Sequence, residues 1–320
     1  MKIVVSDCDH DSMAIETEVF KKAGMSFEIF QCKTEDEAIA QLKGAEIVVN
    51  QYTPMTRKVI AALKPELKQI VRYGVGVNNI DLVAASDLGV QACNVPDYSM
   101  SEVSDQALAM ALALARKVVQ MNALTHAGGW DYQKSIPVFR IAGSTIGVIG
   151  LGRIGRMFAK KAAALDAKIV GFDAYYKPNA ADGSEYITSV SLDELLKTSD
   201  IISINCPLTD ETRHMIDDAA FAKMKPTAYI VNASRGGIID EAALARALEA
   251  KTIAGAALDV AEVEPLPADS PLRKLDTCLL TPHMAWYSEQ AGLELKRKVA
   301  EEACRFARGE AVNYPVNKLK

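Results

Sequence analysis

Short runs of apolar residues alternate with amphipathic stretches along almost the whole chain. A first series of runs comprises KIVVSD, FEIFQC, AEIVVNQ, LKQIVRYG and VQACNVP, and a second comprises STIGVIG, AKIVGFD, DIISINC, TAYIVNAS, IAGAALDV and TCLLTPH. The stretches between them carry apolar residues at helical spacing, as in DEAALARALEAK. Near-continuous apolar strands separated by helices are typical of a parallel sheet covered on both faces. We therefore expect an α/β protein with two doubly wound parallel-sheet domains.

The amphipathic stretches contain local signals for where helices begin. Thr34 and Glu37 form a capping-box pattern, and Ser191 and Glu194 form another. The stretch SEVSDQALAMALALARKVVQMNALTHAGGW, which starts at Ser101, predicts one long helix. Its first half is apolar almost all round, which indicates burial on more than one face. The last amphipathic stretch, SEQAGLELKRKVAEEACRFARGE, predicts a helix that we expect to return to the first lobe.

The composition is that of an ordinary globular protein, with 320 residues, 49% of them hydrophobic, and a formal net charge of −5. The negative charge and the absence of a run of Lys and Arg argue against a nucleic-acid partner. The longest uncharged apolar run is far short of the roughly 20 residues that span a bilayer. The N-terminal apolar stretch is too short for a signal peptide. Six scattered cysteines without a C-x-x-C pattern predict reduced thiols in a cytoplasmic protein.

The segment SDCDHD, after the first apolar run, contains several residue types that bind metals: Asp7, Asp9, His10 and Asp11. Their spacing matches no metal-binding pattern. We therefore expect a polar turn here and no metal ion.

The start of the second series has the parts of a dinucleotide-binding site in the required order. An apolar strand leads into Gly150, Gly152 and Gly155, a G-x-G-x-x-G that opens a helix, and the next strand ends at Asp173. The glycines allow a tight turn, close approach of backbone N–H groups to a pyrophosphate, and close packing of helix on strand. Asp173 would accept hydrogen bonds from ribose hydroxyls and repel a 2′-phosphate. The cofactor predicted is NAD rather than NADP, although Lys177 lies close enough to weaken this preference.

Ligands of such sheets bind outside the carboxyl ends of the strands. In the second series these ends carry Cys206, Pro207, the segment 232–235, Asp259 and His283. Arg235 lies between an apolar run and two glycines, and it could hold a carboxylate and polarise a carbonyl. Glu262 and Glu264 are both possible partners for His283, and the pattern alone does not choose between them.

The chain resembles the D-isomer-specific 2-hydroxyacid dehydrogenases over essentially its whole length. The resemblance rests on RYGVGVNNID, NVPDYSMSEVSDQALAMALALAR, GLGRIGR, NASRGGIIDEAALARAL, GAALDVAEVEP and LLTPHMAWYSEQA. The last of these is most similar to the branch containing the C-terminal binding proteins, whose histidine is likewise followed by Trp, Tyr, Ser, Glu and Gln.

The resemblance implies a domain organisation and a catalytic set. Residues 1–98 with 288–320 would form a flavodoxin-like substrate domain, and residues 99–287 a Rossmann NAD-binding domain. The catalytic residues would be Arg235, Glu264 and His283, with Glu264 chosen because it precedes Pro265 as in the family pattern. The resemblance also implies a homodimer formed through the cofactor domains.

The strand ends and the resemblance together give two sets of expected contacts. Cofactor contacts are expected from Val75, Gly150, Gly152, Arg153, Ile154, Gly155, Asp173, Cys206, Pro207, Thr212, Ala233, Ser234, Arg235, Asp259, His283 and Trp286. Substrate contacts are expected from Tyr52, Arg72, Tyr73, Gly74, Val75, Gly76, Arg235 and Trp286, with the glycine loop offering backbone N–H groups to a carboxylate.

The function predicted is NAD-dependent reduction of a small 2-keto acid such as glyoxylate, hydroxypyruvate or a related sugar acid. His283 would protonate the oxygen as hydride reaches the carbonyl carbon, since an imidazole titrates near neutral pH. One alternative is an NAD(H)-sensing module like the C-terminal binding proteins. The other is a phosphoglycerate dehydrogenase, which would need cations for a phosphate, and Arg57 with Lys58 is the available pair.

Overall fold

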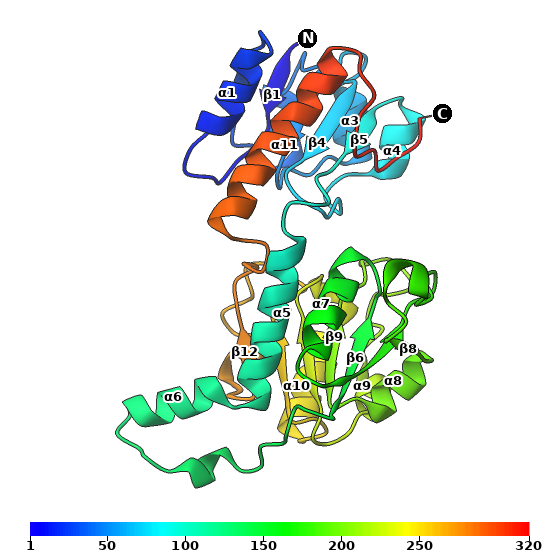
Figure 1. Cartoon of the computed structure of the whole chain (residues 1–320). Coiled ribbons are helices and arrows are strands. Elements are labelled where there is room, and N and C mark those ends of the chain that lie inside the picture. Colours follow the sequence, from blue (N-terminus) through cyan, green and yellow to red (C-terminus); the bar gives the residue numbers. More distant parts are fainter. Residues whose placement is uncertain (320) are drawn as a thin grey trace. The chain divides into compact units, whose positions relative to one another are not determined.

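The computed structural model describes residues 1–319, which divide into two compact units. One unit is formed by Met1–Ser99 together with the segment from Ser288 onward, and the other by Met100–Tyr287. Each unit is built on its own parallel sheet (Figure 1). The expectation of an α/β protein with two parallel sheets is therefore confirmed.

The first unit has a five-stranded parallel sheet in the order β2-β1-β3-β4-β5, which is the flavodoxin order. The strands are β1 (Ile3–Val5), β2 (Phe27–Ile29), β3 (Ile47–Asn50), β4 (Gln69–Arg72) and β5 (Gln91–Cys93). The helices are α1 (Ala14–Lys22), α2 (Glu35–Gln41), α3 (Arg57–Ala62), α4 (Leu82–Asp87) and α11 (Glu289–Ala307). The last helix packs on α1 and contacts β3 and β4, as the return of the chain to this lobe requires. Alternate strand residues, such as Val4, Val48 and Ile70, form a core with α2, α3 and α4.

The second unit has a seven-stranded parallel sheet in the order β12-β11-β10-β9-β6-β7-β8, the Rossmann order extended by one strand. The strands are β6 (Thr145–Ile149), β7 (Lys168–Phe172), β8 (Thr188–Ser189), β9 (Ile201–Ile204), β10 (Tyr229–Asn232), β11 (Gly255–Leu258) and β12 (Cys278–Leu280). The helices are α5 (Met100–Ala115), α6 (Val118–His126), α7 (Arg153–Ala163), α8 (Leu192–Thr198), α9 (Asp218–Phe221) and α10 (Glu241–Glu249). Short 3-10 turns are η1 (Tyr132–Ser135), η2 (Ala180–Asp182), η3 (Gly236–Ile238) and η4 (Pro271–Lys274).

Helix starts follow the sequence signals closely. The Thr34 hydroxyl accepts the N–H of Glu37, whose carboxylate accepts the N–H of Thr34, so this capping box is complete. Ser191 accepts only the N–H of Glu194, so the second expected box is a simple cap. Both arrangements satisfy N–H groups that have no partner within the helix.

The expectation of one long helix from Ser101 is wrong. The segment forms α5 and α6, which meet at an angle of 61°. Lys117, between the two helices, has a left-handed backbone conformation with φ of 51°. This conformation changes the direction of the chain without a glycine or proline. Helix α5 is packed into the unit, whereas α6 buries none of its residues. Within residues 1–319 no single helix has the length and apolar character needed to cross a membrane, and only this bent pair meets those criteria jointly.

Candidate active site

The three glycines of the turn that leads from β6 into α7 differ in why a larger residue would or would not fit. Gly150 has φ of 89°, and a Cβ there would lie 2.6 Å from the backbone nitrogen of Cys206. A Cβ on Gly155 would lie 1.9 Å from the carbonyl oxygen of Gly150, so the helix could not approach the turn. A Cβ on Gly152 would meet no atom within 4 Å. The turn is therefore packed tightly on the protein side and open at Gly152, which fits a pyrophosphate bound at the start of α7.

Asp173, directly after β7, holds the glycine turn against the end of that strand. Its carboxylate accepts the N–H groups of Leu151 at 2.7 Å, Tyr175 at 2.8 Å and Tyr176 at 2.9 Å. Burial raises the pKa of Asp173, but these hydrogen bonds and the charge of Lys177 outweigh it and the pKa lies below its ordinary value. A carboxylate has about four acceptor positions, so one remains for a ribose hydroxyl.

Arg156, in the first turns of α7, was not predicted as part of this site. Its guanidinium lies 4.5 Å from the centre of the Tyr176 ring, and its Nη1 donates to the carbonyl oxygen of Leu151 at 2.7 Å. Its Nε lies 3.9 Å from Asp182, to which the Tyr176 hydroxyl also donates. The guanidinium is thus engaged by an aromatic face, a carbonyl and a carboxylate. No sequence motif signalled this cluster, because folding brings its members together from three segments.

His283 and Glu264 form a close pair. The Nδ1 atom of His283 lies 2.6 Å from Oε2 of Glu264, and because a carboxylate only accepts, Nδ1 carries the hydrogen. The other oxygen of Glu264 accepts the N–H of Ala261 at 3.0 Å. Burial raises the pKa of Glu264, yet it lies below its ordinary value, because the His283 and Ala261 hydrogen bonds and the charge of Arg235 favour the carboxylate. Of the two glutamates left open by the pattern, Glu264 is therefore the partner of His283.

The turn that presents His283 is organised by Asp259, which follows β11. His283 has φ of 52°, and its N–H donates to the carbonyl oxygen of Asp259 at 2.7 Å. The carboxylate of Asp259 is 1% exposed and accepts the Thr281 hydroxyl at 2.6 Å and the N–H groups of Met284 and Ala285 at 3.0 and 2.8 Å. The carboxylate of Asp259, expected as a cofactor contact, thus uses three of its roughly four acceptor positions to hold the turn that carries His283.

Arg235 follows β10 on a segment shaped by Asn232. The buried amide of Asn232 donates to the carbonyl oxygen of Arg235 at 2.8 Å, and its oxygen accepts the N–H of Ser234 at 3.0 Å. Arg235 is partly buried, and its charge contributes to the low pKa of Glu264. The structure thus brings the charge of Arg235 near the pair of Glu264 and His283 in the second unit. Asn232 lies in the strand-end segment 232–235 that the sequence singled out, but no role was predicted for it.

The other expected cofactor residues of this unit lie at the same carboxyl ends. In the loop after β9, the Thr212 hydroxyl donates to the carbonyl oxygen of Pro207 at 2.7 Å, which closes a turn. Burial raises the pKa of the Cys206 thiol to about 11, so it is neutral. The ring of Trp286 packs edge-on against Tyr287, with the ring centres 5.4 Å apart. Arg153 and Ile154 open α7, and Ala233 with Ser234 follows β10.

Apart from Arg235 and Trp286, which belong to the second unit, the expected substrate residues lie in the first unit, after β3 and at the end of β4. A Cβ on Gly74, which has φ of 121°, would lie 1.9 Å from Nη1 of Arg72, so this side chain lies against the glycine loop. The side chain of Tyr73 is buried and donates to Glu16 at 3.0 Å, so only its backbone could contact a ligand. Tyr52 is 60% exposed and Val75 is 37% exposed. Gly76 continues the loop beyond Val75.

The polar segment after β1 and the loop after β3 form one structure. The carboxylate of Asp7 accepts the N–H groups of Gln51, Tyr52 and Thr53, so it closes this loop. Met55, in the same loop, is fully buried in the core. Within residues 1–319, no group of three or more His, Cys, Asp or Glu side chains is arranged to hold a metal ion.

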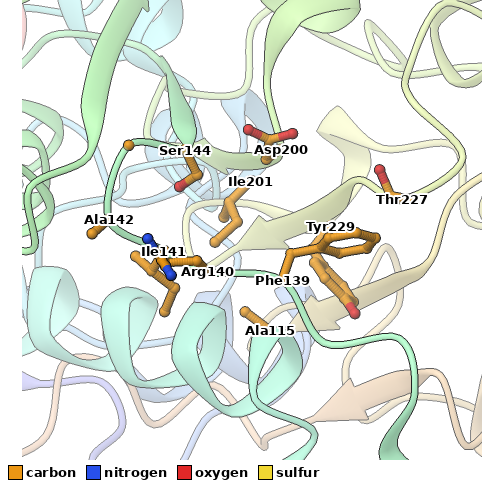
Figure 2. A pocket seen from close by; sticks show the side chains of 11 residues that line it. Ala115, Phe139, Arg140, Ile141, Ala142, Ser144, Asp200, Ile201, Thr227 and Tyr229 are labelled. Carbon is orange, nitrogen blue, oxygen red and sulfur yellow. The ribbon is translucent and has the colours of Figure 1, made fainter.

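A separate pocket of about 450 Å³ lies in the second unit (Figure 2). Its lining includes Ser144, Asp200 and Thr227, which precede β6, β9 and β10, together with Phe139 and Tyr229. The pocket is therefore at the amino ends of these strands, whereas the glycine turn is at their carboxyl ends. It is not the dinucleotide site.

The comparison with known protein families agrees with this geometry. Residues 108–285 match the model of the D-isomer specific 2-hydroxyacid dehydrogenase, NAD binding domain. A glyoxylate reductase of Korarchaeum cryptofilum is 36% identical over 292 residues, which cover 88% of this chain and 87% of that protein. A D-3-phosphoglycerate dehydrogenase of Methanocaldococcus jannaschii is 40% identical over 99% of this chain, but the chain spans only 59% of that protein.

Solved structures give the same result for the fold. The crystal structure of D-lactate dehydrogenase from Aquifex aeolicus, complexed with NAD and lactic acid, has a TM-score of 0.88 and 27% identity, covering 97% of this chain and 96% of that one. The sequence relatives include proteins named D-3-phosphoglycerate dehydrogenase, glyoxylate reductase and hydroxypyruvate reductase, and they do not support the expected placement beside the C-terminal binding proteins. The chain belongs to the D-isomer specific 2-hydroxyacid dehydrogenase family, and residues 108–285 are its NAD-binding domain.

Proposed function

We propose that the chain is an NAD-dependent reductase of a small 2-keto acid, such as glyoxylate, hydroxypyruvate or a related sugar acid. The observation that carries this proposal is the pair of His283 and Glu264, 2.6 Å apart, with Arg235 in the same site. Relatives named glyoxylate reductase and hydroxypyruvate reductase, at 36% and 34% identity, support the same reaction class.

His283 serves as the general acid of the reduction. Bound NADH supplies the hydride for the carbonyl carbon, and the oxygen then needs a proton. Because Nδ1 of His283 donates to Glu264, Nε2 is the atom left to deliver that proton. The Glu264 carboxylate stabilises the imidazolium and fixes the ring orientation. In the oxidative direction neutral His283 takes the hydroxyl proton at the same atom.

Arg235 anchors the substrate. Its guanidinium can hold a carboxylate through two parallel hydrogen bonds and polarise the neighbouring carbonyl. A cation here also stabilises the negative charge that develops on oxygen. The proposal that the first unit is the substrate domain, with the loop Arg72–Gly76 binding the carboxylate, rests on the family resemblance and on the exposure of Val75 in that loop.

Two features favour NAD over NADP. Asp173 is a carboxylate with an acceptor position left for a ribose hydroxyl, and a 2′-phosphate beside it would be repelled. The guanidinium of Arg156, in the same region, already contacts the Tyr176 ring, the Leu151 carbonyl and the Asp182 carboxylate. Both features oppose the binding of an additional phosphate.

A phosphorylated substrate is the second candidate, because relatives at 39–40% identity are named D-3-phosphoglycerate dehydrogenase. The cations suggested for its phosphate are already paired. Arg57 lies 2.8 Å from Asp87, and Lys58 lies 2.8 Å from Asp36. Their charges are thus partly neutralised, which favours an unphosphorylated keto acid.

We also infer a homodimer formed through the second unit. The segment from α6 to η1 and beyond, which we name the apolar arm (118–139), projects from the sheet of this unit in Figure 1. It carries exposed apolar side chains, including Trp130 at 91%, Tyr132 at 76% and Ile136 at 62% exposure. Exposed apolar patches of this kind mark protein interaction sites, and a second copy of the chain is the proposed partner.

The reaction is tested by NADH oxidation with a panel of 2-keto acids: glyoxylate, hydroxypyruvate, pyruvate, longer branched acids and 3-phosphohydroxypyruvate. Turnover of one of these compounds, abolished in His283→Ala, supports the proposal and identifies the substrate. Tight NADH binding without turnover of any compound contradicts it and favours the NAD(H)-sensing alternative.

A further inference from the structure

A second acid–base pair lies beside the pair of His283 and Glu264. Oε2 of Glu262 is 3.2 Å from Nε2 of His214. Oε1 of Glu262 accepts the N–H of Glu241 at 3.0 Å, and the N–H of Glu262 donates to Oε1 of Glu241 at 2.6 Å. Glu262 thus joins the loop after β9, which carries His214, to the start of α10, which carries Glu241.

The segment that carries Arg235 is also in contact with the residues around Glu262 and His214. The N–H of His214 donates to the carbonyl oxygen of Gly237 at 2.8 Å. A Cβ on Gly236 would lie 2.0 Å from the carbonyl of Ala261 and 2.4 Å from the nitrogen of Glu262. Gly236, the residue after Arg235, is therefore pressed against the backbone of Ala261 and Glu262, so a shift of one segment displaces the other.

The same backbone sets the position of Glu264. Glu262 is two residues before it, and the N–H of Ala261 donates to Oε1 of Glu264 while Oε2 meets His283. Orientation of the catalytic pair therefore depends on where Ala261 and Glu262 lie. No atom of Glu262 belongs to the pair itself.

The charges around Glu262 make its partners necessary. Burial raises the pKa of Glu241, and the neighbouring charges of Glu262 and Glu264 raise it further. Three neighbouring carboxylates repel one another unless donors or cations compensate. Here the donors are the backbone N–H groups of Glu241 and Glu262, and Nε2 of His214 lies 3.2 Å from Glu262.

We propose that Glu262, held by His214 and Glu241, is a positioning residue that aligns Glu264 and Arg235 with His283. The proposal rests on the keto-acid reductase function given above. Glu262 acts through Glu264 and needs no contact with substrate or cofactor. A misplacement of about 1 Å in such a site can lower turnover by about a hundredfold.

The test compares the unmodified chain with Glu262→Ala and Glu262→Gln. The alanine removes both side-chain contacts, whereas glutamine keeps an oxygen for the N–H of Glu241 and loses the charge facing His214. Asp218→Asn is the matched control, because it breaks an exposed pair with Arg246 at the other end of α10. We expect Glu262→Ala to lower kcat by roughly ten- to a hundredfold with little change in the NADH dissociation constant, and glutamine to restore part of the loss.

A second readout does not depend on turnover. The chain has four histidines, so the ring signals of His283 can be followed by NMR at a fixed pH and assigned by their loss in His283→Gln. A short hydrogen bond from Nδ1 to the Glu264 carboxylate moves the resonance of the Nδ1 proton far downfield. Misplacing Glu264 in Glu262→Ala should therefore move this signal upfield. Asp218→Asn should leave it in place.

The outcomes separate the two proposals. If the unmodified chain reduces no keto acid, the reductase function is overturned, while the NMR signal of His283 still tests the positioning role. A Glu262→Ala chain whose kcat and His283 signal equal those of Asp218→Asn overturns the positioning role. If Glu262→Ala does not fold, Glu262→Gln decides, because an unchanged kcat and an unchanged His283 signal in that variant also overturn it.

Discussion

Nδ1 of His283 and Oε2 of Glu264 lie 2.6 Å apart, although 18 residues separate them along the chain. Two different turns create this relationship. The turn of His283 is held by the buried carboxylate of Asp259, and that of Glu264 by the N–H of Ala261. In the proposed reaction, Nε2 of the imidazole is therefore the atom that faces the substrate.

Replacing His283 by alanine removes the proposed proton donor. General acid–base catalysis contributes about 10²- to 10⁴-fold, so we expect kcat for keto-acid reduction to decrease by that factor. NADH binding, measured by fluorescence titration, should be retained because the glycine turn and Asp173 are unchanged. His126 is an exposed histidine of α6, and His126→Ala is the control variant. Equal kcat in both variants would remove His283 from the mechanism.

Glu264→Gln tests the effect of the carboxylate on pH dependence. The pKa of Glu264 is lowered, so its stabilising charge is present above its ordinary pKa and is lost only as pH falls through the lowered value. In the unmodified chain, keto-acid reduction should decline with rising pH as His283 loses its proton. Without the carboxylate the ring loses the partner that orients it, so kcat/KM should be lower across the whole pH range.

The measurement for Glu264→Gln is kcat/KM across about pH 5 to 8 with a saturating concentration of NADH. Glu249→Gln, at the end of α10, provides a control glutamate outside the site. A variant profile that superimposes on that of the unmodified chain would show that Glu264 does not influence the proton donor.

Asp173→Ala should reduce the preference for NAD over NADP. The change removes the acceptor for the ribose hydroxyls and the charge that repels a 2′-phosphate. Because this carboxylate also holds Leu151, Tyr175 and Tyr176, Asp173→Asn is the companion variant that keeps one acceptor oxygen. The ratio of kcat/KM for NADH to that for NADPH is the measurement. An unchanged ratio in a folded Asp173→Ala chain would argue against the ribose role.

The glycine turn gives a paired prediction. Gly155→Ala places a Cβ 1.9 Å from the carbonyl oxygen of Gly150, so the helix must shift. Overpacking of this kind costs about 1–3 kcal/mol, and we expect a lower Tm by calorimetry. Gly152→Ala meets no protein atom within 4 Å, so its Tm should be unchanged while NADH binds more weakly. A Gly152→Ala chain that binds NADH normally would place the pyrophosphate elsewhere.

Much of the fold and of the candidate site was predictable from the pattern of neighbouring residues in the sequence. Apolar strands, caps and the glycine turn are encoded in neighbouring residues, and polar side chains at strand ends indicated Arg235 and His283. The choice between Glu262 and Glu264 was open because both lie in one loop, and only the fold places Glu264 against His283. Strand β8 was missed because it is two exposed residues without an apolar run. The break at Lys117 lacked any glycine or proline signal.

The apolar arm (118–139) provides the last prediction. If a second copy covers it, the chain should elute as a dimer in size-exclusion chromatography with light scattering. Trp130→Ser combined with Tyr132→Ser removes the two most exposed aromatic rings of the arm and should shift the population toward monomer. Tyr175→Ser is the control, since Tyr175 is 98% exposed but lies outside the arm. A monomeric unmodified chain, or a double variant that remains as dimeric as the control, would mean that the arm does not join two copies.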